Sequence, residues 1–415
     1  TELPFELTEA QQRVLKDIDH DLQSGHPMLR LLQGDVGSGK TLVAALAALP
    51  VIDAGFQVAL MAPTELLSEQ HAAQFAAWFS PLGISVGWLT GSMKAQPRRT
   101  ILEQIANGSC QMVIGTHALF QTDIVFHQLG LAIIDEQHRF GVNQRKDLLK
   151  KCTVPNLLAM TATPIPRTLM LTSYGDMDVS VLAEKPIGRK PIDTRIIPVN
   201  RIDEVMEAVG RSINSGEKVY WVCPVIEDSK VNDLAAAEER YDSLCHFFPE
   251  RVGLLHGRLS IEKKKDALKK FQTGLFDIMV STTVIEVGVD VSNATVIIIE
   301  HAERFGLAQL HQLRGRVGRN SKTSNCILLY SNTLSTIARA RLQVLRDTQD
   351  GFKIAEEDLK LRGGGELLGT RQSGLPDYRL ANLAIHEDLL RIANKDALNL
   401  LINREAIGKV VLTTL

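Results

Sequence analysis

The sequence is poor in the features that mark several large classes of protein. Aromatic residues make up only 5% of the 415 residues, and the five cysteines are scattered without any C-x-x-C pair. Cysteines in this arrangement are typical of reduced, buried side chains rather than of zinc ligands or a disulfide framework. No apolar run is long enough to cross a bilayer, and no signal peptide is recognisable. We therefore expect a cytoplasmic protein without membrane contact.

Neither sign of charge is in clear excess. Lys and Arg number 46 against 48 Asp and Glu, which gives a formal net charge of -2. This balance argues against a protein that coats nucleic acid through bulk positive charge, although a local basic groove remains compatible with it. Hydrophobic residues amount to 45%, enough for ordinary cores in two or three domains. The sequence starts at Thr1 without an initiator Met, and we expect it to be a part of something longer.

Apolar, strand-like runs alternate with longer amphipathic stretches in the first half of the chain. Helical patterns cover Lys40–Ala54 and Glu65–Phe79. The candidate strands are Met28–Leu32, Gln57–Met61, Val113–Gly115, Leu131–Ile134 and Leu157–Met160. Such alternation predicts a doubly wound parallel sheet, in which ligands bind at the carboxyl ends of the strands.

A second alternating series follows the proline-rich segment Glu184–Pro198, which we interpret as an extended linker. Its candidate strands are Val219–Cys223, Val252–Leu255, Ile278–Ser281, Val296–Ile299 and Cys326–Tyr330. The predicted fold class is α/β, with two doubly wound parallel-sheet domains in tandem over residues 1–187 and 188–335. Residues 336–415 are predicted to be helical, with a break at Gly363–Gly365 and a further helix over Leu380–Leu401.

A phosphate-binding loop lies between the first candidate strand and the first long helix. The segment from Gly34 to Thr41 matches the pattern G-x-x-x-x-G-K-[ST]. Gly34, Gly37 and Gly39 let backbone N–H groups curl around an anion at the start of a helix. Lys40 is expected to reach the β- and γ-phosphates of ATP, and the Thr41 hydroxyl is expected to hold Mg²⁺.

Two acidic residues follow the apolar strand Leu131–Ile134. Asp135 is expected to complete the Mg²⁺ shell, and Glu136 is expected to polarise the attacking water. His138 has two interpretations: it couples the nucleotide state to DNA, or it satisfies a local hydrogen bond. These residue types in this order predict ATP hydrolysis.

The second half has no P-loop but contains a cluster of three arginines. Arg314, Arg316 and Arg319 lie at spacings of two and three residues, punctuated by glycines. Hydrolysis spreads negative charge over the γ-phosphoryl oxygens, and an arginine from a neighbouring domain stabilises that charge. Arg316 and Arg319 are the candidates for this role. Arg314 serves either a DNA phosphate or the structure.

The order of these motifs resembles that of superfamily-two helicases. The further matching segments are Phe5 to Gln11, Ala62–Leu66, Thr90–Gly91, Gly115–His117, Thr161–Thr163, His256–Gly257, Thr282 to Asp290 and Gln309 to Arg319. The resemblance implies two RecA-like domains that close on one nucleotide. It also implies that Phe5 and Gln11 read adenine and that Gly288 and Asp290 belong to the nucleotide site.

The same resemblance implies a DNA track along both domains. Thr64, Thr90, Thr116 and Thr282 are the candidates for contacts with the DNA backbone, because small hydroxyl groups bind phosphates without reading bases. The alternative for each of them is ordinary capping at the end of a strand.

Narrower segments resemble the RecG family. These are Asp135 to Arg145, Thr161 to Thr168, Arg341 to Phe352 and Leu361 to Gly374. The last two resemble the translocation motif that this family shares with the transcription-repair coupling factor, a helical hairpin followed by a loop. Gly364 departs from the proline usual in the family, which implies a more flexible loop.

Within that loop, the resemblance implies roles for three polar residues. Arg371 and Gln372 are expected to contact DNA, and Arg362 is expected to couple hydrolysis to movement. Glycines surround all three, which suits a close approach to a ligand better than a core. The alternative is that this C-terminal region only packs against the motor.

The resemblance thus implies an ATP- and Mg²⁺-dependent DNA helicase that drives branch migration and fork reversal. Forks and Holliday junctions are the expected DNA partners when the family's N-terminal wedge, an OB-fold, is present; we expect it to be absent here. A monomer is expected, with single-stranded DNA-binding protein as a further partner. Two alternatives stay open: a duplex translocase of the transcription-repair coupling type that remodels protein–DNA complexes, and an inactive nucleotide-binding module.

Overall fold

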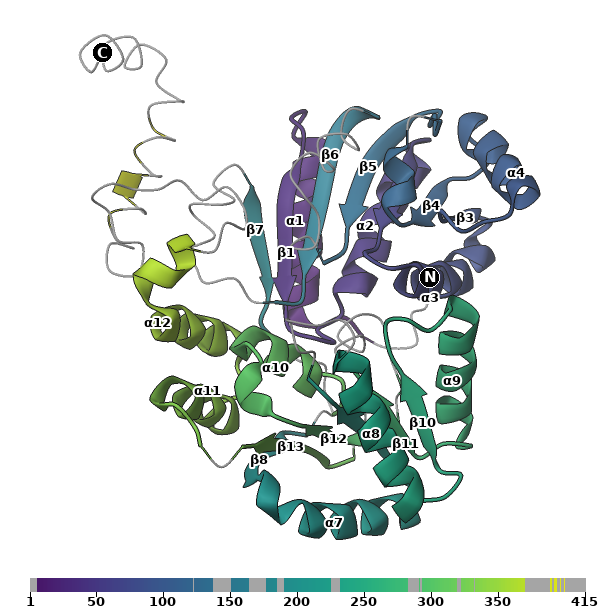
Figure 1. Cartoon of the computed structure of the whole chain (residues 1–415). Helices are drawn as coiled ribbons and strands as arrows, with labels where there is room; N and C mark the ends of the chain where they lie inside the picture. Colours follow the sequence, from purple (N-terminus) through teal and green to yellow (C-terminus); the bar gives the residue numbers. More distant parts are fainter. Residues whose placement is uncertain are drawn as a thin grey trace.

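The computed structural model consists of two parallel sheets, each covered by helices, with a pair of helices after the second sheet (Figure 1). It describes residues 6–121, 123–136, 151–163, 177–184, 190–224, 232–282, 291, 293–318, 322–331 and 333–369, together with residues 389, 392, 393, 396 and 399. The two sheets confirm the predicted α/β class and its tandem arrangement. None of the described helices is long and apolar enough to cross a membrane.

The first sheet has seven strands in the order β3-β4-β2-β5-β6-β1-β7. Every adjacent pair within it is parallel. Its strands are β1 Leu29–Gly34, β2 Gln57–Met61, β3 Val86–Leu89, β4 Met112–Gly115, β5 Leu129–Ile134, β6 Cys152–Thr161 and β7 Asp178–Leu182. The connecting helices are α1 Glu9–Gln23, α2 Lys40–Asp53, α3 Glu65–Phe79 and α4 Ala95–Ala106, with short 3₁₀ turns at Ser80–Leu82 and His117–Phe120.

Both faces of this sheet are buried, as continuous apolar strands require. Along β5, Leu131 and Ile133 pack into one core, and Ala132 and Ile134 pack into another. Successive side chains on a strand point to opposite faces, so an unbroken apolar run predicts helices on both sides. The parallel pairing then places all the carboxyl ends of the strands at one edge.

The second sheet has six strands in the order β10-β11-β9-β12-β13-β8, again all parallel. Its strands are β8 Ile192–Pro198, β9 Lys218–Val222, β10 Val252–Leu255, β11 Ile278–Ser281, β12 Ala294–Ile299 and β13 Ser324–Tyr330. Its helices are α7 Ile202–Asn214, α8 Asn232–Phe247, α9 Ile261–Thr273 and α10 Leu307–Arg314, with 3₁₀ turns at Val199–Arg201 and Ala302–Arg304. The predicted domain limits at residues 187 and 335 themselves stay predictions.

Three strands escaped the sequence analysis: β3, β7 and β8. The last of these corrects the predicted linker, because Ile192–Pro198 pairs along its whole length with β13 at the edge of the second sheet. Its prolines suggested a linker, yet a proline is tolerated in an edge strand, where one row of N–H groups has no ladder partner. The exposed, mixed-polarity residues of β7 likewise gave a weak signal.

Two helices follow the second sheet, α11 Thr336–Asp347 and α12 Gly351–Gly369, and they pack beside α10 (Figure 1). The predicted break at Gly363–Gly365 is wrong, since α12 continues through these glycines. Buried Ile354 and Leu359 anchor the first part of α12. Extending an existing helix costs much less than nucleating one, which offsets the poor helix propensity of glycine. The predicted helix over Leu380–Leu401 lies almost entirely outside the described residues.

A buried glutamine at the amino end of β2 joins two connecting segments of the first domain. The Gln57 side chain, only 2% exposed, donates to the carbonyls of Ile105 and Cys110 at 3.0 and 2.7 Å. Its Oε1 accepts from the N–H groups of His127 and Gln128 at 2.8 and 3.2 Å. All the hydrogen-bonding capacity of this amide is therefore used by backbone groups of two connecting segments.

We expect Gln57→Leu to lower the free energy of unfolding by about 2–5 kcal/mol, because several buried backbone groups lose their partner at roughly 1–3 kcal/mol each. Urea denaturation would measure this loss. Gln104→Leu on α4, an exposed glutamine, is the matched control and should change stability by less than about 0.5 kcal/mol. Equal midpoints for the two variants would contradict the structural role of Gln57.

Candidate nucleotide site between the two domains

The P-loop joins β1 to α2 with two residues in the left-handed backbone region. Gly37 has φ 73° and Gly39 has φ 89°, conformations that other residues adopt only with strain. A Cβ on Gly39 would lie 2.3 Å from Nε2 of Gln11. The N-terminus of α2 carries no side-chain cap, so the helix start offers its backbone N–H groups and its dipole to an anion. Gly34, Lys40 and Thr41 occupy the expected places around this turn.

Lys40 is buried, and its ammonium lies over the loop. Nζ donates to the carbonyl oxygens of Gly34 at 2.8 Å and of Asp35 at 3.0 Å. Its charge also acts on both Asp135 and Glu136. The lysine therefore contacts the phosphate loop and lowers the pKa values of both carboxyl groups through its charge.

Gln11 supports the P-loop from α1. Its Nε2 donates to the Ser38 carbonyl at 3.1 Å, and its Oε1 accepts from the N–H of Thr8 at 3.0 Å in a capping box. This arrangement places the residue directly against the phosphate loop. The role of Gln11 in reading adenine stays a prediction.

Asp135 follows β5 at the carboxyl edge of the sheet. Its Oδ2 lies 2.9 Å from Nε2 of His71, and its Oδ1 accepts from the N–H of Glu136 at 3.0 Å. Burial on its own would raise the pKa of Asp135, but the hydrogen bond with His71 and the charge of Lys40 bring it below its usual value. Asp135 is therefore held as a carboxylate, the form that binds a divalent cation.

Glu136 has a different environment. Its backbone adopts φ 52°, which is uncommon outside glycine, and its Oε2 accepts from the N–H of Ala162 at 3.4 Å. Burial and the adjacent charge of Asp135 raise the pKa of Glu136 above its usual value. A carboxylate with a raised pKa is better matched to proton transfer near neutral pH.

His71 was missed by the sequence analysis. It lies on α3 with only 5% of its surface exposed, packs edge-on against Phe75 and contacts Asp135 across the sheet edge. In the sequence it reads as one polar position of an amphipathic helix, 64 residues before its partner. Only the fold brings the two together.

Arg316 of the second domain is close enough to Glu136 of the first domain to affect its pKa. It is 9% exposed, lies two residues beyond the end of α10, and its charge acts on Glu136. Arg314 is more deeply buried and donates to the carbonyls of Leu345 and Thr348 at the end of α11. Of the two roles considered for Arg314, this environment fits a structural one.

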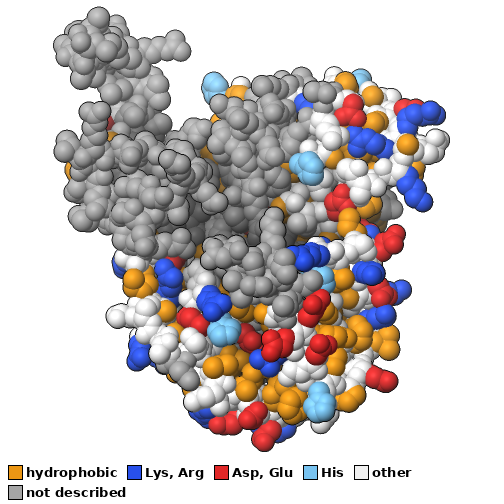
Figure 2. All heavy atoms as spheres, viewed as in Figure 1, with side chains coloured by type: hydrophobic (Ala, Val, Ile, Leu, Met, Phe, Trp, Pro, Cys, Tyr) orange, Lys and Arg blue, Asp and Glu red, His pale blue; other side chains and the backbone are white. Residues whose placement is uncertain are grey.

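The four threonines predicted for DNA contact follow strands at the carboxyl edges of the two sheets. Thr64 caps α3 by accepting from the N–H of Leu67 at 3.3 Å, whereas Thr90, Thr116 and Thr282 come directly after β3, β4 and β11. The buried Thr116 Oγ1 has no hydrogen-bond partner among the described residues. On the face drawn in Figure 2, described Lys and Arg side chains are mixed with Asp and Glu over both domains. The assignment of these threonines to DNA stays a prediction.

Several predicted residues lie outside the part that the structure describes. These are Phe5, His138, Gly288, Asp290, Arg319, Arg371 and Gln372. Arg362 falls on α12, but its side chain is not among the described ones. Their assigned roles therefore stay predictions.

One P-loop, two carboxylates beside it and an arginine from a second parallel-sheet domain define a tandem RecA-like, nucleotide-driven motor of the helicase class. Family models agree with this class. Residues 8–172 match the DEAD/DEAH box helicase model, and residues 200–321 match the helicase conserved C-terminal domain. A structure of the Mycobacterium smegmatis helicase Lhr bound to ssDNA and AMP-PNP has a TM-score of 0.61 at 19% identity, covering 83% of this chain and 48% of that one. At that identity the likeness concerns the fold alone.

The chain belongs to the RecG family of ATP-dependent DNA helicases. It corresponds to the motor region of the proteins in this family. Residues 348–410 match domain 3 of RecG. RecG of Haemophilus influenzae and RecG of Escherichia coli K12 are each 54% identical over 387 residues, which is 92% of this chain and 56% of either relative. A structure of RecG bound to a three-way DNA junction has a TM-score of 0.75 at 46% identity, covering 94% of this chain and 51% of that one. The chain thus spans little more than half the length of these relatives.

We expect Glu136→Gln to bind ATP normally and to lose about 10²- to 10⁴-fold in the rate of hydrolysis, because an amide cannot accept the proton of the attacking water. Phosphate release measured alongside nucleotide binding would separate the two effects. Glu103→Gln on the exposed side of α4 is the control and should leave both unchanged. A wild-type rate in Glu136→Gln would remove this residue from the mechanism.

Arg316→Ala and Arg314→Ala should differ in kind. The first should slow hydrolysis by about 10³- to 10⁵-fold with little loss of ATP affinity or stability, as expected for an arginine that stabilises the transition state. The second should lower the melting temperature, because backbone carbonyls at the end of α11 lose a buried donor. Thermal unfolding and ATPase rates on both variants give the comparison. A folded Arg316→Ala enzyme of normal rate would exclude the finger role.

Proposed function

We propose that this chain is an ATP-driven, double-stranded DNA translocase of the RecG type that supports branch migration and fork reversal in recombination and repair. The observation that carries the proposal is the approach of the second domain to the P-loop: Nε2 of His311 lies 2.8 Å from Oδ1 of Asp35, and the charge of Arg316 lowers the pKa of Glu136. Groups from both domains act at one phosphate site, so a change in the nucleotide alters how the domains meet. A motor needs this coupling between chemistry and domain movement.

Each protein group has a distinct task in hydrolysis. The P-loop backbone and Lys40 bind the phosphates and orient the γ-phosphoryl group. Glu136 positions the attacking water and accepts its proton. Arg316 stabilises the charge that develops on the γ-phosphoryl oxygens, with Arg319 as a second candidate for this role.

Thr41 and Asp135 offer a hydroxyl and a buried carboxylate, the hard oxygen ligands that suit Mg²⁺. No group of three or more His, Cys, Asp or Glu side chains in the described part of the chain could hold a metal by itself. This fits Mg²⁺, which is commonly bound by one or two carboxylates together with substrate phosphates and waters. When bound, the ion would neutralise phosphate charge during transfer.

We further propose that Thr64, Thr90, Thr116 and Thr282 grip the DNA backbone, and that Arg362, Arg371 and Gln372 transmit hydrolysis to DNA movement. The RecG structure of 46% identity has a three-way DNA junction bound. Forks and Holliday junctions are the branched partners we propose when a wedge domain is present. We also propose a monomeric motor, with single-stranded DNA-binding protein as a further partner.

Two alternatives are distinguished by simple assays. A duplex translocase of the transcription-repair coupling type would be stimulated fully by plain duplex, whereas a RecG-type motor joined to its wedge domain would respond most to junctions. An inactive nucleotide-binding module would release no phosphate with ATP, Mg²⁺ and any DNA. The charge of Lys40 acts on both Asp135 and Glu136, and that of Arg316 acts on Glu136, which supports an active enzyme over the inactive module.

We expect this chain by itself to hydrolyse ATP slowly, with weak stimulation by DNA and little preference for forks. Strand-end hydroxyl and backbone groups contact phosphates without recognising a branch point, so DNA affinity should fall steeply with salt. ATPase rates and DNA binding on a fork and on a plain duplex of equal length, at two salt concentrations, test this. A preference of about tenfold or more for the fork, which corresponds to roughly 1.4 kcal/mol, would show that the motor has its own junction-reading surface.

A further inference from the structure

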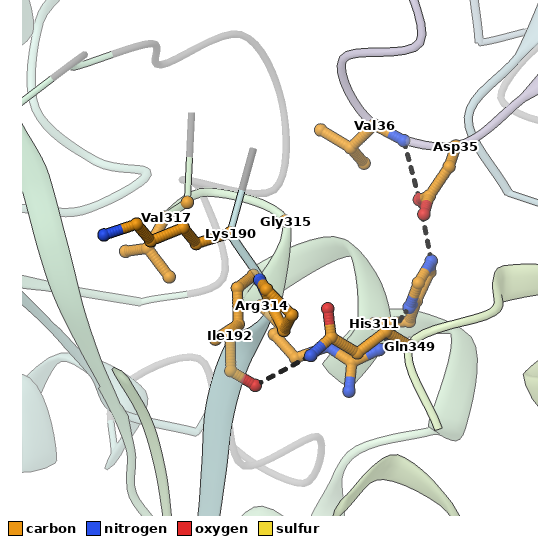
Figure 3. Close-up of a pocket in the computed structure, with 11 residues that line it drawn as sticks. Asp35, Val36, Lys190, Ile192, His311, Arg314, Gly315, Val317 and Gln349 are labelled. Carbon is orange, nitrogen blue, oxygen red and sulfur yellow. Dashed lines mark hydrogen bonds and ion pairs between the residues drawn. The ribbon is translucent and has the colours of Figure 1, made fainter. Parts of the chain in front are cut away.

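A histidine of the second domain binds the P-loop of the first. His311 lies on α10, and its Nε2 is 2.8 Å from Oδ1 of Asp35 (Figure 3). Its side chain is 5% exposed and that of Asp35 is 16% exposed, so the contact is largely shielded from water. The two residues are 276 positions apart in the chain. This hydrogen bond is therefore a direct link between the phosphate loop and the segment that carries Arg316.

The other ring nitrogen of His311 is also engaged. Its Nδ1 lies 3.1 Å from Nη2 of Arg314. A guanidinium only donates hydrogen bonds, so Nδ1 must be the acceptor and the ring proton must sit on Nε2. Nε2–H then donates to the Asp35 carboxylate. Arg314 fixes the tautomer of His311 and at the same time donates to the carbonyls of Leu345 and Thr348.

A close packing contact accompanies this chain of hydrogen bonds. A Cβ placed on Gly315 would lie 2.9 Å from Cβ of Val36, the P-loop residue next to Asp35. Only glycine allows the end of α10 to approach the P-loop this closely. Asp35, Val36, His311 and Gly315 all line the same small pocket between the domains (Figure 3).

The position of Arg316 depends on this contact through the backbone. The N–H of Gly315 donates to the His311 carbonyl at 3.0 Å, and the N–H of Arg316 donates to the Leu313 carbonyl at 3.0 Å. His311 and Arg316 thus belong to one continuous turn at the end of α10. Fixing His311 on Asp35 also fixes the direction in which Arg316 leaves that turn.

We propose that His311 is a positioning residue for hydrolysis: by donating to Asp35 of the P-loop, it holds the end of α10 so that Arg316 faces Glu136. The inference rests on the proposed function, since it deepens the role of the same site. The groups that face His311 are Asp35 from the P-loop and Arg314 from its own helix. We call the hydrogen bond between His311 and Asp35 the latch. Arg314 connects this latch to the end of α11, so movement of α11 and α12 can be transmitted to the P-loop.

Two substitutions of His311 separate the latch from simple stability. His311→Asn places an amide oxygen near the position of Nδ1, which retains an acceptor for Arg314 but does not reach Asp35. His311→Gln extends an amide nitrogen towards Asp35 and gives up the acceptor for Arg314. We expect His311→Asn to lower kcat on the order of ten- to hundredfold, the range for loss of one hydrogen bond to a charged group, with a smaller change in KM for ATP.

His311→Gln should recover most of kcat yet melt at a lower temperature. Asp35→Asn, which keeps an acceptor without the charge, should have an intermediate kcat. The double variant Asp35→Asn/His311→Asn should be no slower than His311→Asn, because both changes remove the same interaction. A wild-type kcat in His311→Asn would overturn the proposal. Equal loss of kcat and of stability in both His311 variants would overturn it as well, since His311 would then be purely structural.

Glu69→Gln is the matched control at a different contact between the domains. Its carboxylate accepts from Nζ of Lys265 on α9 at 2.6 Å, but the two side chains remain 38% and 40% exposed, so this pair should contribute little. We expect a normal kcat in Glu69→Gln. A loss equal to that in His311→Asn would show that any weakening between the domains slows hydrolysis, and it would overturn a specific role for His311.

Failure of the proposed function is recognised separately. If the unmodified chain releases no phosphate with ATP, Mg²⁺ and DNA, the proposed function fails. The latch is then judged from the distance between spin labels at the exposed positions Gln104 and Glu207, with a non-hydrolysable ATP analogue. His311→Asn should broaden or lengthen this distance relative to the parent. Identical distance distributions would overturn the latch as well.

Discussion

The close approach of the P-loop to the end of α10 is the contact on which the candidate site depends. Val36 and Gly315 come so near that no side chain larger than hydrogen fits on the glycine without movement. Beside them, Asp35 accepts a hydrogen bond from His311. In the mechanism that we propose, neither domain holds all the groups for hydrolysis, because Lys40, Asp135 and Glu136 belong to the first domain and Arg316 belongs to the second. The chemistry is therefore available only when this contact forms.

The electrostatics of the site follow from the same arrangement. Lys40, Asp135 and Arg316 are buried and Glu136 is half-buried; the charge of Lys40 acts on both carboxylates, and the charge of Arg316 acts on Glu136. The neighbouring carboxyls have pKa values shifted in opposite directions, which is the pattern expected when adjacent acids have different tasks. Asp135 is suited to bind a cation, and Glu136 is suited to exchange a proton. This separation arises from His71 on one side and from burial on the other.

Helix α3 joins this site to the predicted DNA track. Thr64 caps its start, and His71 lies 2.9 Å from Asp135. A change at the strand-end loop before α3 could therefore act through this one helix on Asp135, the carboxylate that we propose binds Mg²⁺. Helix α10 has the corresponding position in the second domain, between the P-loop and the end of α11. Two helices thus connect the nucleotide to the surfaces on which we propose that DNA acts.

The sequence predicted much of the fold and the candidates for the nucleotide site, because these features have local residue patterns. The P-loop, the acidic pair and the arginine cluster each combine a residue pattern with a strand or helix boundary, and buried parallel strands such as β2 and β5 have an unmistakable apolar run. Strands with mixed polarity, such as β7 and β8, and the glycine-containing part of α12 were misjudged, because their stability comes from neighbours rather than from their own residues.

What the sequence by itself determined was the class of fold, and it supplied the candidates for the reacting groups. Phosphate binding and catalysis need particular side chains at fixed spacings along one segment, and those spacings are visible in the sequence. Only the tertiary structure decided which distant residues serve them. His71 meets Asp135 across 64 positions, and His311 meets Asp35 across 276. Such contacts are set by how two sheets and their helices pack, and no local pattern of residues encodes a distance between domains.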